Sequence, residues 1–255
     1  MATTIAISGK GGSGKTTLAA MIIRLLCKQG AGPVLAVDAD PNSCLGLMVG
    51  VSPQISVAQL REQAREKPAS QGMDKVRSFE YGIQQAVTEA DKFDLLTMGR
   101  PEGPECYCAV NNLLRQFLDK LSTTYSFVVI DNEAGMEHLS RRTTNNIDLL
   151  CIVAESTPLG TITAKRIYDL AKQLPISVKK IGIIWNRSDA INNLEGIETF
   201  GLIPYDKTVL DASMQSKTVF DLNEDKPALS AVRKILENIL NQNNLSLTHN
   251  SKLKT

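Results

Sequence analysis

The sequence predicts an α/β fold built on a doubly wound, mostly parallel β-sheet. Short apolar segments that contain many β-branched residues alternate with longer segments of helical periodicity. A glycine-rich turn, residues 9–14, joins the first apolar segment to the first helical one. Segments that are apolar throughout are typical of strands covered on both faces. Right-handed connections between such strands would place helices on both sides of the sheet.

The individual elements follow from these patterns. The predicted strands are Thr3–Ser8, Pro33–Asp38, Phe93–Met98, Phe127–Asp131, Leu149–Ala154 and Lys179–Asn186. The predicted helices are Lys15–Gln29, Ala109–Ser122, Leu159–Leu174 and Lys226–Leu240. Residues 51–92 show no clear periodicity, and we expect them to form excursions from the main sheet.

Composition favours one domain that works in the cytoplasm. The chain has 255 residues, of which 43% are hydrophobic, and we assign residues 1–241 to the domain and residues 242–255 to a polar, flexible tail. The formal net charge of +1 gives no reason to expect nucleic acid or an anionic membrane as partner. We see no secretory leader and no apolar run near the roughly 20 residues that cross a bilayer.

The cysteine content also favours a reducing compartment. Five cysteines are an odd number, which suits free thiols better than a disulfide framework. Cys27 lies in an apolar helical segment and Cys151 in a strand, so both are expected in the core. Cys44 follows Asp40, and buried packing is expected for it too.

The glycine-rich turn has the pattern of a phosphate-binding P-loop. Gly9-Lys10-Gly11-Gly12-Ser13-Gly14-Lys15-Thr16 follows an apolar strand and opens a helix, which is the context that the motif requires. Its amides and the helix N-terminus bind anionic charge, with Lys15 on the β- and γ-phosphates and the Thr16 hydroxyl on Mg²⁺. The predicted nucleotide-binding residues here are Gly11, Gly12, Ser13, Gly14, Lys15, Thr16 and Thr17.

Acidic residues end two of the predicted strands. Asp38 and Asp40 close the second strand, and residues two apart on a strand point the same way. Asp131 closes the strand that begins at Phe127. These carboxylates can therefore face the phosphate pocket, although an aspartate after a strand often only caps a turn.

Lys10 makes the loop resemble the deviant Walker A motif of the MinD/ParA/nitrogenase-iron-protein class. In that class the early lysine reaches across a dimer interface to the partner's nucleotide. The resemblance implies an ATP-dependent homodimer, a P-loop ATPase of MinD-like fold, and catalytic roles for Lys10, Lys15 and Asp40, the last orienting or activating the attacking water. It further implies that Asp38 and Asp131 support Mg²⁺, in part through water. A solvated loop lysine is the plain alternative.

Two later segments resemble the base-binding elements of the same class. Asn186 and Arg187 end a predicted strand, where an asparagine amide pairs with adenine in that class. Pro204 lies in a segment that resembles the loop closing over the base. An amide can both donate to and accept from the adenine edge. The guanine-binding Asn-Lys-x-Asp element is absent, so we expect ATP and ADP as ligands.

Cys106 and Cys108 stand one residue apart, just before a predicted helix. Two thiolates fill half of a tetrahedral metal site, and a homodimer would supply the other half by symmetry. Thiolate ligands suit Zn²⁺, Ni²⁺ or Cu(I). Two unbound thiols remain the alternative. His138 is assigned no metal role.

These segments together resemble the CooC-type nickel-insertion ATPases that mature carbon monoxide dehydrogenase, and the related AcsF-type ATPase of acetyl-CoA synthase. The segments are Gly9–Thr17, Asp38–Gly46, Glu105–Cys108 and Asp131–Leu139. The resemblance implies that Cys106 and Cys108 of two protomers bind Ni²⁺, with Zn²⁺ as a possible replacement, and deliver it to either client enzyme.

Other functions stay open at this point. A MinD- or ParA-type positioning ATPase would need a membrane-seeking tail or a basic surface. An electron-transfer ATPase with a [4Fe–4S] cluster across the dimer would need a cysteine soon after Asp131, where the chain has none before Cys151. A scaffold that binds nucleotide without hydrolysing it is a third possibility.

Overall fold

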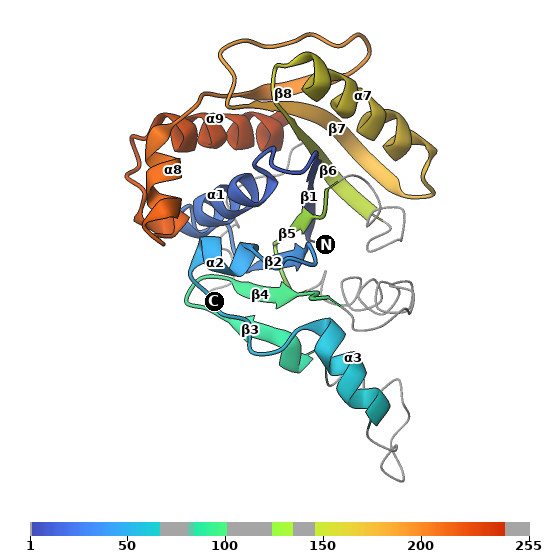
Figure 1. The fold of residues 1–255 in the computed structure, drawn as a ribbon, viewed down its shortest axis with the longest axis vertical. Helices are drawn as coiled ribbons and strands as arrows, with labels where there is room; N and C mark the ends of the chain where they lie inside the picture. The colour runs from blue at the N-terminus through green and yellow to red at the C-terminus, as the bar shows by residue number, and fades with distance from the viewer. Residues whose placement is uncertain (1, 67–81, 83, 101–123, 135–145, 243–255) are drawn as a thin grey trace, which may run out of the picture.

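The computed structural model describes residues 2–66, 82, 84–100, 124–134 and 146–242. Within them an eight-stranded sheet has the order β3-β4-β2-β5-β1-β6-β7-β8 (Figure 1). The strands are β1 (Thr3–Gly9), β2 (Val34–Ala39), β3 (Val87–Glu89), β4 (Asp94–Thr97), β5 (Phe127–Asn132), β6 (Asn146–Ala154), β7 (Ser177–Asn186) and β8 (Glu198–Ile203). Neighbours are parallel except β3 and β4, which are antiparallel. The mostly parallel α/β fold is therefore confirmed.

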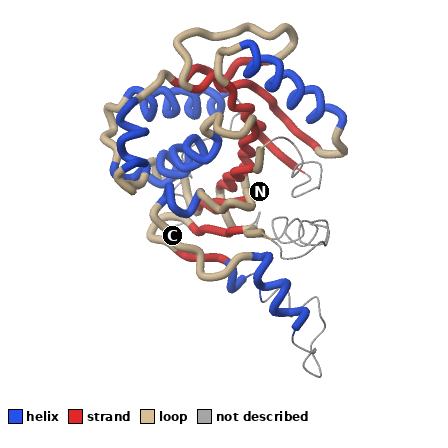
Figure 2. The backbone as a smooth tube through the Cα atoms, viewed as in Figure 1, coloured by secondary structure: helices blue, strands red, loops and turns tan. Residues whose placement is uncertain are grey.

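Helices cover both faces of this sheet. They are α1 (Lys15–Lys28), α2 (Leu45–Val49), α3 (Val57–Glu66), α7 (Pro158–Gln173), α8 (Lys207–Met214), α9 (Pro227–Gln242) and the 3₁₀ turn η1 (Val219–Asp221). Alternate residues of β1 point to opposite faces: Ile5 and Ile7 pack in the core shared with α1 and α9, and Ala6 packs in the core shared with α7. Figure 2 shows the strands in red between these two layers.

The predicted strands are all present, with ends that differ by a few residues. Two strands of the described residues, β3 and β8, were not predicted from the sequence. β3 spans three residues at the sheet edge, too few to show a period. β8 has a mixed polar sequence with Gly201 inside it, where a Cβ would lie 2.4 Å from Ile235 Cγ1 of α9. That close contact between helix and sheet explains a glycine that, in sequence, weakens the strand pattern.

The predicted helices at Lys15–Gln29, Leu159–Leu174 and Lys226–Leu240 correspond to α1, α7 and α9. The predicted helix Ala109–Ser122 lies outside the described residues. Within residues 51–92, the structure describes the elements α3 and β3. β3 pairs with β4 and is the edge strand of the main sheet, so the expectation that this segment leaves the sheet does not hold for β3. α9 ends at Gln242, one residue beyond the expected end of the domain.

The described cysteines agree only in part with expectation. Cys151 is buried in β6, and Cys27 is partly buried against the core. The prediction for Cys44 is wrong, because its side chain is exposed. Cys44 precedes α2, and it is Leu45 and Val49 on that short helix that turn inward. In the part of the chain that the structure describes, no helix has the length and apolar character needed to span a bilayer.

The strand order sets the location of the site. From β1 the chain crosses to β2 on one side and later enters β6 on the other. Ligands of open α/β sheets bind at the carboxyl ends of the strands, where such a reversal occurs. The P-loop follows β1 at this point, and the ends of β2 and β5 lie beside it.

Candidate functional site

The P-loop curls between the end of β1 and the start of α1. Gly12 and Gly14 have φ values of +76° and +94°, a conformation that glycine adopts without strain. The carbonyl oxygen of Lys10 accepts hydrogen bonds from the Ser13 amide at 3.2 Å and from Lys15 Nζ at 3.3 Å. Lys15 is thereby folded against its own loop and is only 6% exposed. Loop amides and a lysine then converge where a phosphate would bind.

Asp38 is a fully buried carboxylate at the end of β2, with a solvent exposure of 0%. Its Oδ2 accepts from the Leu45 amide at the start of α2, at 2.8 Å, and its Oδ1 accepts from the Asp40 amide at 3.3 Å. Burial raises the pKa of Asp38 to about 7, and these amide bonds oppose the increase. Asp38 thus connects the start of α2 to the carboxyl end of β2.

Asp131 is equally buried at the end of β5, but its two carboxylate oxygens have no hydrogen-bond partner among the described residues. Burial raises its pKa to about 6, while the Thr16 hydroxyl and the Lys15 charge act in the opposite direction. Thr16 is near enough to affect this pKa without making a well-formed hydrogen bond. Since an unpaired buried carboxylate is costly, a ligand is expected here. Carboxylate and hydroxyl oxygens fit Mg²⁺.

Asp40 is held within its own turn. Its Oδ1 accepts from the backbone amide of Asn42 at 2.9 Å and from the Asn42 side chain at 2.8 Å. The turn is strained at Ser43, which has a φ of +51°. The part of Asp40 in activating water stays a prediction, because the carboxylate would have to leave Asn42 for it.

A mostly apolar cavity of about 230 Å³ lies beside the P-loop, between α1, α2, α8 and the end of β7. All three residues expected to bind the base line it, namely Asn186, Arg187 and Pro204. The other lining residues are Gly14, Thr17, Leu18, Met21, Met48, Ile203, Tyr205, Asp206, Val209, Leu210, Ser213 and Ala228. A flat, largely apolar ring is the kind of group that such a cavity accepts.

The sequence did not single out the apolar residues of this cavity. Met21 and Met48 belong to helices whose neighbouring residues pack in the core, so periodicity makes them indistinguishable from core residues. Leu210 is on α8, a helix of eight residues without a fully buried residue, which is too short to show a clear helical period in the sequence. Among the apolar lining residues, the sequence gave a signal only for the segment around Pro204.

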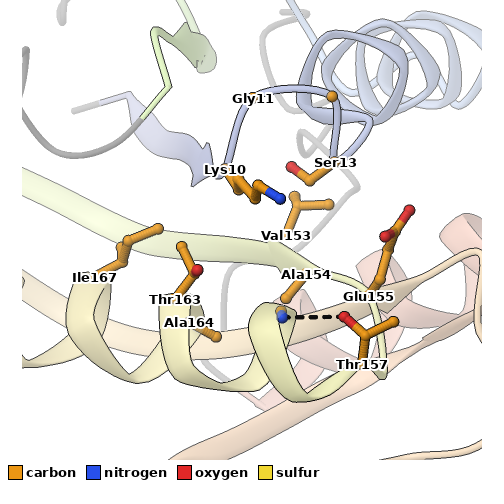
Figure 3. A pocket seen from close by; sticks show the side chains of 12 residues that line it. Lys10, Gly11, Ser13, Val153, Ala154, Glu155, Thr157, Thr163, Ala164 and Ile167 are labelled. Carbon is orange, nitrogen blue, oxygen red and sulfur yellow. Dashed lines mark hydrogen bonds between the residues drawn. The ribbon is translucent and has the colours of Figure 1, made fainter.

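A second, smaller cavity of about 60 Å³ separates the outer side of the P-loop from β6 and the start of α7. Figure 3 shows Lys10 extending from the loop over β6, with the Ser13 side chain beside it. Thr157 closes the start of α7 by accepting from the Gly160 amide at 3.1 Å. Lys10 is exposed and forms no ion pair within the described residues.

Residues 4–219 match the family described as CbiA, the CobQ/CobB/MinD/ParA nucleotide binding domain. The chain belongs to this family. Together with the P-loop and the similarity to named ATP-binding proteins, this membership makes it a P-loop ATPase. An uncharacterized ATP-binding protein of Methanocaldococcus jannaschii is 39% identical, over 93% of this chain and 98% of its own length.

Two other relatives of this CobQ/CobB/MinD/ParA family member carry functional names. The carbon monoxide dehydrogenase accessory protein CooC of Rhodospirillum rubrum is 32% identical, over 86% of this chain and 90% of its own. The septum site-determining protein MinD of Pyrococcus horikoshii, solved with Mg-ADP, superposes with a TM-score of 0.68 at 20% identity, covering 94% of this chain and 96% of its own. The second likeness is evidence for the fold alone.

The structure brings the P-loop, Asp38, Asp40 and Asp131 to one edge of the sheet in this family member, with Asn186, Arg187 and Pro204 around the adjoining cavity. Cys106, Cys108 and His138 lie outside the described residues. Among the residues that are described, no cluster of three or more His, Cys, Asp or Glu side chains could hold a metal ion. A magnesium ion at Asp131 would therefore need phosphate oxygens of the nucleotide as further ligands.

Proposed function

We propose that this ATPase inserts nickel into carbon monoxide dehydrogenase or acetyl-CoA synthase, as a cytoplasmic homodimer that binds Ni²⁺ through Cys106 and Cys108 of both protomers. The observation that carries the proposal is the 32% identity to CooC, a carbon monoxide dehydrogenase accessory protein, over 86% of this chain. The pair Cys106 and Cys108 adds a thiolate donor set suited to Ni²⁺.

In this proposal each residue at the carboxyl ends of the strands has a role in binding or hydrolysing the nucleotide. Lys15 and the loop amides hold the β- and γ-phosphates, Thr16 and Asp131 provide oxygen ligands for Mg²⁺, and Asp38 supports that shell. Bound Mg²⁺ would supply charge neutralisation at the phosphates. Asp40 orients the attacking water once it is released from Asn42.

Lys10 links nucleotide state to the assembly. It projects from the exposed side of the loop with no ion-pair partner within the described residues. In the proposed dimer it reaches the nucleotide of the second protomer, so ATP favours closure. Closure brings the two cysteine pairs onto one Ni²⁺, and hydrolysis loosens the site. A change in nickel affinity of ~10⁴-fold would need ~5.5 kcal/mol of differential binding.

The deciding experiment is an anaerobic Ni²⁺ titration by calorimetry, with ADP and with a non-hydrolysable ATP analogue, combined with the mass of the assembly from light scattering. We expect a dimer with one shared Ni²⁺ in the ATP-like state and no such site in the variant with Cys106→Ser and Cys108→Ser. Cys44→Ser is the matched control, because Cys44 is an exposed thiol outside the pair. Undiminished nickel binding by the double variant contradicts the proposal.

Membership of the CobQ/CobB/MinD/ParA family leaves a second candidate function, an ATPase of the MinD or ParA type that positions other components on a membrane or on DNA. ATP-dependent co-sedimentation with anionic liposomes or with DNA would favour this candidate. The nickel proposal predicts that the protein stays in the supernatant in both assays and in every nucleotide state.

A further inference from the structure

We propose that Asn186 and Arg187 position the phosphate loop itself, and that Asn186 thereby couples occupation of the base cavity to the binding of phosphate. The inference follows from two contacts between β7 and the P-loop. Asn186 Nδ2 donates to the carbonyl oxygen of Ser13 at 2.8 Å, and the Arg187 guanidinium donates to the carbonyl oxygen of Gly12. The residues that the sequence assigns to the base thus hold two consecutive loop carbonyls.

Holding a carbonyl fixes the direction of the next amide. In a planar trans peptide, the C=O of one residue and the N–H of the next point to opposite sides. Asn186 draws the Ser13 carbonyl toward β7, and this turns the Gly14 amide to the other side. Arg187 does the same at Gly12, where the following Ser13 amide closes the loop onto Lys10. The contact at Gly12 therefore keeps the loop curled, and the contact at Ser13 leaves the Gly14 amide available to an anion.

Gly14 makes the contact with Asn186 possible. A Cβ on Gly14 would lie 2.3 Å from Asn186 Nδ2, which no side chain could occupy without displacing the amide. The last glycine of the loop is therefore required for two reasons, its left-handed backbone and the space that Asn186 fills.

The turn that carries both side chains is braced from two sides. Arg187 has a φ of +53°, a strained value for a residue with a side chain. The Ser188 hydroxyl donates to the Asn186 carbonyl at 3.0 Å and accepts from the Ser156 amide at 3.0 Å. The Ser188 amide donates to the Ile203 carbonyl at 3.2 Å. These bonds hold the turn in the conformation that aims Asn186 and Arg187 at the loop.

Arg187 also joins the loop to the start of α7. Its guanidinium forms an ion pair with Glu155 at 2.7 Å, so one side chain connects Gly12 to the carboxyl end of β6. Both partners are about two-fifths exposed, and the pair is therefore worth more as a restraint on geometry than as a source of stability.

Asn186 keeps hydrogen-bonding capacity after its contact with the loop. An amide side chain has two N–H donors and one carbonyl acceptor, and one donor is used at Ser13. The remaining groups are available to the base cavity, which Asn186 also lines. A base bound there would restrict the rotation of Asn186, and the Ser13 carbonyl would be held more firmly.

The test uses magnesium tripolyphosphate, a ligand that has phosphates but no base, beside Mg-ATP. Asn186→Asp keeps the size of the side chain, removes the donor and places a carboxylate against the Ser13 carbonyl. We expect calorimetry to show about tenfold weaker binding of both ligands. Tyr205→Ala is the matched control, since Tyr205 lines the cavity and, within the described residues, forms no hydrogen bond or ion pair with the loop. It should weaken Mg-ATP and leave tripolyphosphate within twofold.

If Asn186→Asp leaves tripolyphosphate binding within twofold of wild type, Asn186 serves the base alone and the inference is wrong. Arg187 gives an independent variant should Asn186→Asp fail to fold. Arg187→Gln should raise the KM for ATP and weaken tripolyphosphate, and Arg187→Lys should restore part of both at an unchanged melting temperature. Equal behaviour of the two Arg187 variants contradicts a positioning role. None of these assays involves nickel, so their outcome is independent of whether the protein inserts nickel.

Discussion

Asp38 and Asp131 are direct neighbours in the register of β2 and β5, and both carboxylates are withdrawn from solvent. They differ in their partners: Asp38 accepts two backbone amides, whereas neither oxygen of Asp131 has a hydrogen bond in the described part of the chain. The charge of Asp131 contributes to the raised pKa of Asp38. The two carboxylates therefore have different roles: Asp38 holds the start of α2, and Asp131 is left for a cation.

Asp131→Asn should reduce Mg²⁺-dependent ATP hydrolysis by at least ~100-fold, because it removes the charged ligand expected to hold the metal at the phosphates. The nucleotide-free variant should be as stable as wild type or more so, since a buried unpaired charge is lost. Phosphate release across a magnesium titration and thermal unfolding without nucleotide measure the two effects. Asp148→Asn is the control, because Asp148 binds the Thr4 amide at the opposite end of the strands. Hydrolysis by Asp131→Asn within tenfold of wild type would count against the magnesium role.

Gly14→Ala should abolish nucleotide binding, because the new Cβ would displace Asn186 and strain a backbone with a φ of +94°. Gly30→Ala provides a matched comparison. Gly30 also has positive φ, at +63°, but a Cβ there meets no atom within 4 Å. It should cost about 1 kcal/mol of unfolding free energy through backbone strain and leave ATP binding unchanged. Chemical denaturation and calorimetry would show this contrast, and equal loss of ATP affinity in both variants would oppose it.

The sequence was most informative where a strand is buried on both faces. β1, β2, β5 and β6 are apolar runs, and the ends of the first three carry the loop or an aspartate, so the fold and the phosphate site were predictable together. Short elements such as β3 and α2 were not, because a few residues cannot show a period. α8, with eight residues and none of them fully buried, was missed for the same reason.

The contacts of Asn186 and Arg187 in the base site could not be predicted from the identity of these residues. Asn186 and Arg187 were assigned to adenine, and they do line the cavity, but their contacts with Gly12 and Ser13 join segments about 175 residues apart. No local pattern contains that pairing. Cys44 was expected to be buried and is exposed, and local sequence could not show this either. The direction of a side chain at the start of a helix depends on which neighbouring residues reach the core.

Lys10→Gln and Lys15→Gln should separate assembly from binding. Lys15 is folded into the loop beside Asp131, so its loss should weaken Mg-ATP by at least ~100-fold. Lys10 is exposed and points away toward β6 and α7, so Lys10→Gln should keep ADP affinity within a fewfold and lose the ATP-dependent dimer. Calorimetry with ADP and light scattering with an ATP analogue provide the readouts. A Lys10→Gln protein that still dimerises with ATP would exclude a role for this lysine across the interface.

Glu224 is the centre of a charged cluster that ties α1 to the segment after η1. Arg24, only 1% exposed, lies 2.7 Å from Glu224 and donates to the Leu222 carbonyl at 2.6 Å. Lys28 and Arg233 also pair with Glu224. The Lys28 hydrogen bond, followed by that of Arg24, lowers the pKa of Glu224 from 4.5 to about 2.

Glu224→Gln should therefore destabilise the protein in a pH-dependent way. Between about pH 2 and pH 4.5 the folded wild type binds fewer protons at this site than the unfolded chain, so its stability increases with pH there and levels off above. Because Glu224 is 45% exposed, we expect the variant to lose only about 1 kcal/mol at pH 7. That difference should shrink steadily as the pH falls from 4.5 toward 2. Urea unfolding of both proteins at pH 7, 5 and 3 measures it, and an equal difference at pH 7 and pH 3 would show that the charge of Glu224 contributes nothing.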